Sequence, residues 1–112
     1  MNASVENHPL GATGVWSAAL RYGDVAAAAE AAAELESLGY GALWVPDVGG
    51  DLFGALENLL EATSTATIAT GILNLWMHTP EETAARYNEF VSGFGERLML
   101  GIGVSHAPLA NM

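Results

Sequence analysis

The stretch "GALWVPD", residues 41–47, decides the fold of this chain. Its apolar residues occupy both faces of an extended segment, which is typical of a strand covered on both sides in a parallel sheet. The strand ends at Pro46 and Asp47, where a turn rich in glycine follows. Parallel strands need long crossover connections, so we expect a helix on each side of this segment.

Segments with helical spacing do flank it. Residues 23–39 consist of good helix formers, with Asp24 placed as the N-cap and Gly39 as the C-terminal stop. We expect this helix to bury one apolar face, made of Val25, Ala28, Ala32, Leu35 and Leu38. Residues 51–64 carry leucines at helical spacing, and Asp51 is placed to cap them.

The segment "TPEETAARYNEFVSG", residues 79–93, predicts a third helix with a well-specified start. Thr79 is placed to cap it, Pro80 fits the first helical position, and Glu82 completes a capping box. Glu82 and Arg86 are four residues apart, which predicts an exposed ion pair.

Three more segments read as strands, namely residues 14–20, 65–72 and 97–105. Together with residues 41–47 they give four strands that alternate with three helices. This alternation is typical of parallel pairing through right-handed crossovers, so the predicted fold class is α/β. We expect a flexible leader over residues 1–13 and one domain over residues 14–112.

Composition narrows the possible functions. The 112 residues are 51% hydrophobic, and a net charge of -10 disfavours contact with nucleic acid or anionic lipid. No run reaches the ~18 apolar residues of a membrane span, and the N-terminus lacks the pattern of a secretion signal, so a cytoplasmic protein is expected. The absence of cysteine excludes disulfides and thiol nucleophiles.

Polar residues gather where the predicted strands end. In parallel α/β folds the site lies at the carboxyl ends of the strands, which here include Asp47, residues 71–78, residues 103–106 and the segment near Arg21. Each of these polar residues also has a structural interpretation that involves no chemistry. Asp47 also suits a glycine-rich turn, and His78, directly before a capping residue, is typical of a solvated loop.

The remaining motifs give no specific chemistry. His106 lies at a strand end, where a lone histidine has a structural as well as a catalytic interpretation. Residues 101–106 do not form a dinucleotide fingerprint, and Ser105 lacks the glycines of a nucleophile elbow. The histidines are not at ligand spacing, so no metal site is predicted. Trp16, Trp44 and Trp76 are expected to fill a core or line a pocket.

Three segments carry a resemblance to a known family. They are "LGYGALWVPD" (residues 38–47), "ATGILNLWMHTPEETA" (69–84) and "ERLMLGIGVSHAP" (96–108). In this order and spacing they resemble the luciferase-like monooxygenase superfamily, and within it the oxidoreductases that depend on the deazaflavin coenzyme F-420. The resemblance implies a (β/α)8 barrel. A complete barrel takes about 250 residues, so the four parallel strands would form its N-terminal half, either a truncated gene product or a fragment.

The resemblance also implies roles for individual residues. Gly71 and Ile72 would form a bulge with a non-prolyl cis peptide that backs the cofactor ring, and Asp47 would make a polar contact to that ring. Asn74 and Ser105 would also bind the cofactor. His106 would be the catalytic proton donor. Many deazaflavin-dependent dehydrogenases carry an acidic residue at that position and a histidine where this chain has Val48, which puts a sugar-phosphate dehydrogenase reaction in doubt.

The leading hypothesis is therefore hydride transfer between F-420 and a small organic substrate. An FMN-dependent monooxygenase of the same superfamily is the alternative, and a non-catalytic half-barrel is a third. Self-association is expected because both edge strands would have unpaired backbone groups. The inner face would also be left uncovered; we expect it to include Trp44, Ile68, Ile72, Leu98 and Leu100.

Overall fold

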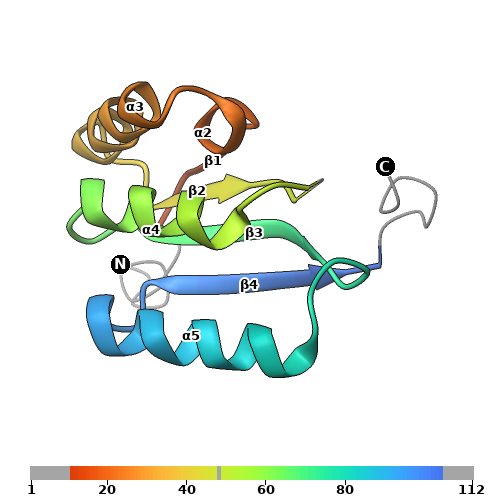
Figure 1. Cartoon of the computed structure of the whole chain (residues 1–112). Helices are drawn as coiled ribbons and strands as arrows, with labels where there is room; N and C mark the ends of the chain where they lie inside the picture. Colours follow the sequence, from red (N-terminus) through yellow and green to blue (C-terminus); the bar gives the residue numbers. More distant parts are fainter. Residues whose placement is uncertain (1–10, 48, 105–112) are drawn as a thin grey trace.

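A computed structural model describes residues 11–47 and 49–104, which contain one four-stranded sheet. Its strands are β1 (Gly14–Trp16), β2 (Ala42–Val45), β3 (Thr67–Asn74) and β4 (Leu98–Gly103). They are all parallel and follow the order β1-β2-β3-β4 (Figure 1). The α/β prediction is confirmed, and the arrangement is consistent with half of a (β/α)8 barrel.

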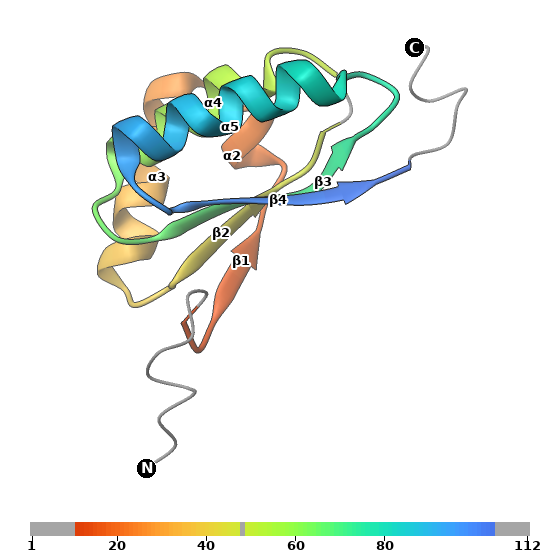
Figure 2. The ribbon, with the colours of Figure 1, turned by 90° about the horizontal axis from the view of Figure 1, so that it is seen from below.

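The described helices form a layer on one face of the sheet (Figure 2). They are α2 (Ala19–Tyr22), α3 (Val25–Ser37), α4 (Leu52–Ala62) and α5 (Pro80–Phe94). The predicted caps are confirmed, because the side chains of Asp24, Asp51 and Thr79 each accept a backbone N–H three residues further on. Within the described part of the chain, no helix is long and apolar enough to cross a membrane.

The expected first strand, residues 14–20, is too long. β1 ends at Trp16, and the chain turns at once into the short helix α2. Ala18, Ala19 and Leu20 are good helix formers, and the turn buries Leu20 and Arg21 against the neighbouring helices. The burial of these two side chains therefore outweighs the β-compatible composition of the segment.

Two predictions about helix surfaces need correction. The ends of the predicted face on α3 are exposed, with Val25 at 67% and Leu38 at 68%, whereas Ala28 and Ala32 in its middle are buried. The two alanines belong to the core cluster, whereas the two larger residues lie at the ends of the helix. On α5, Arg86 pairs with Glu89 at 3.3 Å rather than with Glu82.

The core lies between the sheet and the helices. The side chains of Leu43, Val45, Ile68 and Leu98 pack there with apolar residues of α4 and α5, and Leu100 packs against them. The expectation that Ile68, Leu98 and Leu100 line the inner face was therefore wrong. Side chains alternate along a strand, so Trp44, between Leu43 and Val45, lies on the uncovered face together with Trp16, its register partner in β1.

A bulge interrupts β3 near its carboxyl end. Gly71 pairs with Gly101 and Leu73 pairs with Ile102, so Ile72 between them has no partner in β4. The peptide bond between Gly71 and Ile72 is cis. The bulge and the cis bond that the resemblance implies are therefore present, whereas the binding of a cofactor to them stays a prediction.

Two charged side chains fasten the amino ends of the strands. The Glu36 carboxylate, at the end of α3, accepts the backbone N–H groups of Ser64, Thr65 and Ala66 at 2.7 to 2.9 Å. The Arg97 guanidinium donates to the carbonyls of Ala66 and Leu60 and to the Thr63 hydroxyl. Together they hold the loop before β3 to α3 on one side and to the start of β4 on the other.

Candidate functional site

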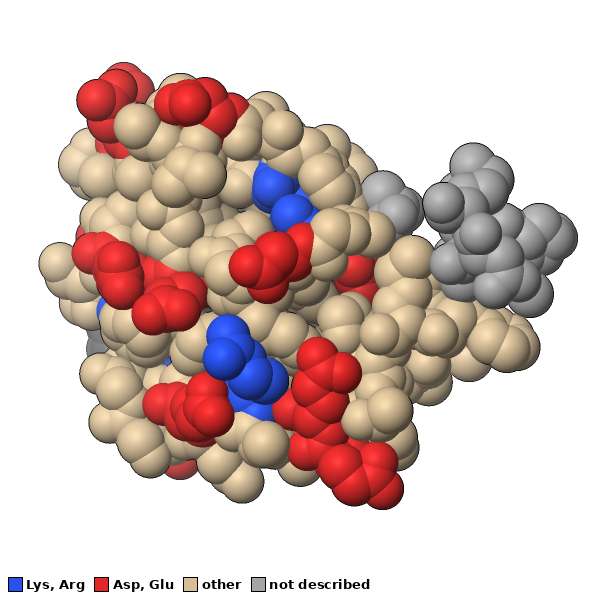
Figure 3. All heavy atoms as spheres, in the orientation of Figure 1, with Lys and Arg blue, Asp and Glu red and all other residues tan. Residues whose placement is uncertain are grey.

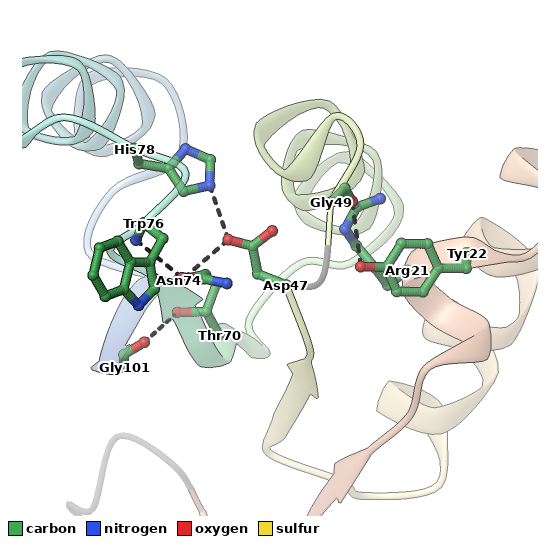
Figure 4. Close-up of polar contacts among 9 residues, drawn as sticks. All are labelled: Arg21, Tyr22, Asp47, Gly49, Thr70, Asn74, Trp76, His78 and Gly101. Carbon is green, nitrogen blue, oxygen red and sulfur yellow. Dashed lines mark hydrogen bonds and ion pairs between the residues drawn. The ribbon is translucent and has the colours of Figure 1, made fainter. Parts of the chain in front are cut away.

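Asp47 joins three segments at the opposite edge of the sheet, where the strands end. It follows β2, and its side chain is fully buried. Its Oδ2 atom accepts the backbone N–H of Asn74 at 2.9 Å and lies 2.8 Å from Nε2 of His78 (Figure 4). The carboxylate therefore ties the end of β2 to the end of β3 and to the turn that precedes α5.

His78 is not the solvated loop residue that the sequence indicated. Its side chain is only 8% exposed, and its ring meets the ring of Phe53 edge-on, with centroids 5.4 Å apart. The residue lies 31 positions from Asp47, so no local pattern connects the two. Only the topology of the sheet could predict that the two residues lie close together, because a residue just after β3 must lie close to the end of β2 in a parallel sheet.

Asn74, the last residue of β3, shapes the turn that follows. Its Oδ1 atom accepts the backbone N–H of Trp76 at 3.0 Å, and its carbonyl accepts the N–H of Met77. Its Nδ2 group and Oδ1 of Asp47 are both buried and have no hydrogen-bond partner in the described part of the chain. Such orphaned groups are rare in folded proteins, so this donor and acceptor on neighbouring strand ends are candidates for pairing with a polar ligand or with water.

An apolar surface lies on the uncovered face near the bulge. Trp16, 58% exposed, donates its Nε1–H to the carbonyl of Gly71 at 3.0 Å. Ile72 is 37% exposed on this face, whereas Ile102 lies beside α5 on the helix-covered face. Gly71 and Gly101 lie opposite each other without side chains, so this part of the sheet is flat. A flat apolar surface beside an indole suits a planar ring.

A second cluster orders the glycine turn after β2. Arg21 and Tyr22, both on α2, direct their polar groups to the carbonyl of Gly49 at 2.6 and 3.3 Å (Figure 4). The Arg21 guanidinium also lies over the Tyr22 ring, 4.4 Å from its centroid. The sequence placed Arg21 near a strand end but gave no sign of this contact, which depends on the short helix that it did not predict.

The charged side chains on the face shown in Figure 3 are mostly acidic. Of the three arginines, Arg97 donates to carbonyls and a hydroxyl, Arg86 pairs with Glu89, and Arg21 holds Gly49. The described residues thus offer little positive charge for an anionic ligand tail. Nor do they contain a group of three or more acidic or histidine side chains able to hold a metal ion.

Of the predicted site residues, the structure brings Asp47 and Asn74 into direct contact and places Gly71 and Ile72 at the bulge beside them. Ser105, His106 and also Val48 lie outside the described residues. The tryptophans Trp16 and Trp76 are more than half exposed at this edge rather than in a core.

Comparison with known proteins adds a decisive observation to this geometry. The sequence model of the luciferase-like monooxygenases matches residues 4–111, almost the whole chain. The chain belongs to the luciferase-like monooxygenase family. A search of curated proteins finds no match. Members of the luciferase-like family are oxidoreductases and monooxygenases that use flavin-type cofactors, and the site of this luciferase-like chain lies where parallel α/β enzymes carry their chemistry.

Proposed function

We propose that this luciferase-like protein is the N-terminal part of an oxidoreductase that transfers a hydride between the deazaflavin coenzyme F-420 and a small organic substrate. One observation carries the proposal. The bulge in β3 lies between an exposed apolar surface, formed by Trp16 and Ile72, and the orphaned polar atoms of Asp47 and Asn74.

These residues fit a flavin or deazaflavin ring in shape and in chemistry. Such rings are planar and carry N–H and C=O groups along one edge, and when bound they donate or accept the hydride. Oδ1 of Asp47 would accept the N–H, and Nδ2 of Asn74 would donate to the C=O. Both atoms are fully buried, so the ring would pair with them only after side chains at the rim shift. Trp16 and Ile72 would then cover one ring face and exclude water from it.

We assign the proton transfer to His106 and a cofactor contact to Ser105. Both follow β4 in the sequence, and β4 ends at the edge of the sheet where Asp47 lies. An imidazole donates protons readily near neutral pH. We expect His106→Ala to lower kcat by about 100-fold while the affinity for the cofactor changes little, the size typical of a lost general acid. Steady-state kinetics beside a cofactor titration check this, and an equal fall in both quantities would make His106 a binding residue.

The FMN-dependent monooxygenase is the second candidate. The matched family is described as luciferase-like monooxygenase, and FMN presents a planar ring of the same width. The two candidates share the bulge and the apolar surface and differ in whether oxygen reacts. The resemblance of the three segments to F-420-dependent enzymes supports the deazaflavin.

A fluorescence titration with F-420 and FMN in parallel tests the proposal. We expect tighter binding of F-420. Asn88→Ala is a matched control, because Asn88 is exposed on α5 and contacts neither Asp47 nor the bulge. A preference for FMN would favour the FMN-dependent monooxygenase over the F-420-dependent oxidoreductase. Binding of neither cofactor would favour a non-catalytic half-barrel.

A further inference from the structure

His78 is a buried imidazole for which the proposed reaction has no role. It lies in the turn between β3 and α5, one residue before the cap of that helix. Although 31 residues separate it from Asp47, its Nε2 atom lies 2.8 Å from Oδ2 of that carboxylate. Figure 4 shows its second ring nitrogen directed away from Asp47.

The hydrogen bonds indicate which nitrogen carries the proton. Oδ2 of Asp47 already accepts the Asn74 N–H, and a carboxylate is an acceptor, so the partner nitrogen Nε2 must donate. Nδ1 is buried and has no partner among the residues that the structure describes. The hydrogen bond to Asp47 therefore requires a proton on Nε2, whereas Nδ1 takes no part in it.

Packing fixes the orientation of this ring. Phe53, buried in the core on α4, meets it edge-on with an interplanar angle of 79°. Arg86 of α5 in turn lies over the Phe53 ring, 5.3 Å from its centroid. The imidazole therefore has little freedom to rotate, and its Nε2–H is aimed at one carboxylate oxygen.

We propose that His78 is a positioning residue for Asp47. Its Nε2–H and the Asn74 N–H occupy Oδ2 and so leave Oδ1 as the oxygen that a ligand N–H meets. The role rests on the proposed function, because it requires a ligand that uses Asp47. It makes the turn before α5 part of the binding site, although His78 itself does not touch the ligand.

Two substitutions separate the hydrogen bond from the volume of the ring. The side-chain amide of His78→Gln carries a donor at about the reach of Nε2, whereas His78→Ala removes it. We expect His78→Ala to weaken binding of F-420 or FMN by about 10-fold or more, and His78→Gln to recover most of that loss, as for a hydrogen bond to a charged group. Asn88 and His78 line one apolar pocket beside α5, and Asn88 is exposed. The control variant Asn88→Ala should bind the cofactor like the wild type.

The ring itself gives a readout that does not need the ligand. Nitrogen-15 spectra of the unliganded protein should show a His78 imidazole protonated on Nε2, assigned by its loss in His78→Gln, and circular dichroism should show that the variants fold. The positioning role would be overturned by a ring protonated on Nδ1 alone, by an unchanged affinity in His78→Ala, or by equal losses of affinity in the two variants. If the wild type binds neither cofactor while the ring is protonated on Nε2, the proposed function fails and the ligand role of His78 fails with it, whereas the hydrogen bond stands.

Discussion

At the scale of single residues, Gly71 sets what can lie against the bulge. A Cβ atom at this position would lie 3.4 Å from the Trp16 indole and 3.6 Å from Trp44, which is ordinary contact. A methyl group therefore fits, and a branched side chain would push the indole that donates to the Gly71 carbonyl. We expect Gly71→Val to abolish cofactor binding and Gly71→Ala to retain most of it.

The same fluorescence titration checks both variants, with thermal unfolding to show that each one folds. An unchanged affinity in Gly71→Val would remove the bulge from the binding site. A folded Gly71→Ala protein that binds nothing would mean that the backbone of the bulge, rather than the space beside Trp16, limits binding.

Sequence reasoning located part of this site at the residue scale. Asp47 and Asn74 could be predicted because strand ends converge at one edge of a parallel sheet, and the structure brings the two into contact. The burial of His78 could not, since it depends on Phe53 of α4 and on a carboxylate far away in the sequence. Residue type and local spacing contain no information on such a contact.

At the scale of elements, Glu36 connects α3 to the start of β3. Partial burial raises the pKa of its carboxyl group, but the N–H groups of Ser64, Thr65 and Ala66 and the Thr65 hydroxyl together lower that pKa below its ordinary value. A lowered pKa in the folded state stabilises the protein above the pKa of the unfolded chain. This stabilisation is lost as the pH falls through the lowered pKa.

We therefore expect Glu36→Gln to lower the free energy of unfolding by about 1 kcal/mol near neutral pH, a small value because solvent screens the half-buried group. The difference between variant and wild type should shrink as the pH falls through the lowered pKa of Glu36, below which both side chains are neutral. Urea unfolding at several pH values measures it. A difference that is constant with pH would mean that charge has no part in this contact.

Gly101 shows how closely β4 approaches the residue before the bulge. A Cβ atom there would overlap the carbonyl oxygen of Thr70, whose hydroxyl also donates to the Gly101 carbonyl. We expect Gly101→Ala to destabilise the fold by about 1–3 kcal/mol, the usual cost of overpacking. Gly93 on α5 is the matched control, because it is exposed and a Cβ there meets nothing within 4 Å.

Gly93→Ala should instead stabilise the protein by about 0.5–1 kcal/mol, since alanine is the better helix former. Thermal unfolding of the two variants gives the comparison. Equal stability changes would contradict the close approach of β4 to Thr70.

The elements were predictable to different degrees. Helices α3, α4 and α5 begin with caps whose hydrogen bonds span three residues, so the sequence alone contains the signal for where they start. Helix α2 has four residues and no side-chain cap. It forms because Leu20 packs into the core, and this tertiary contact is invisible in a local pattern.

At the scale of the whole molecule, the sheet has two free edges and an uncovered face. The pairing order leaves the outer sides of β1 and β4 without a described neighbour strand. Among the described residues, Trp16 and Ile72 are exposed on or near the uncovered face. Open parallel edges favour association because a second chain can pair with their backbone groups. Exposed apolar surface also favours it, by ~25 cal/mol for each Å² of apolar area buried.

We expect purified residues 1–112 to form dimers or larger species at micromolar concentration, measured by analytical ultracentrifugation. Ile72→Thr should shift the equilibrium toward monomer. Leu38→Ser, also exposed but at the far end of α3, should not. A stable, well-folded monomer in the wild type would contradict the prediction and would mean that the uncovered face tolerates water.

The fastening of the strands by Glu36 and Arg97 has a consequence for how the protein can change. These contacts lie at the amino edge of the sheet, while Asp47, Asn74 and His78 lie at the carboxyl edge. We therefore expect mutational libraries confined to the exposed residues Ile72, Leu75 and Trp76 to vary the surface near the candidate site while the contacts of Glu36 and Arg97 and the buried strand ends are untouched. Such a division lets selection explore new substrates without first having to acquire stabilising substitutions elsewhere.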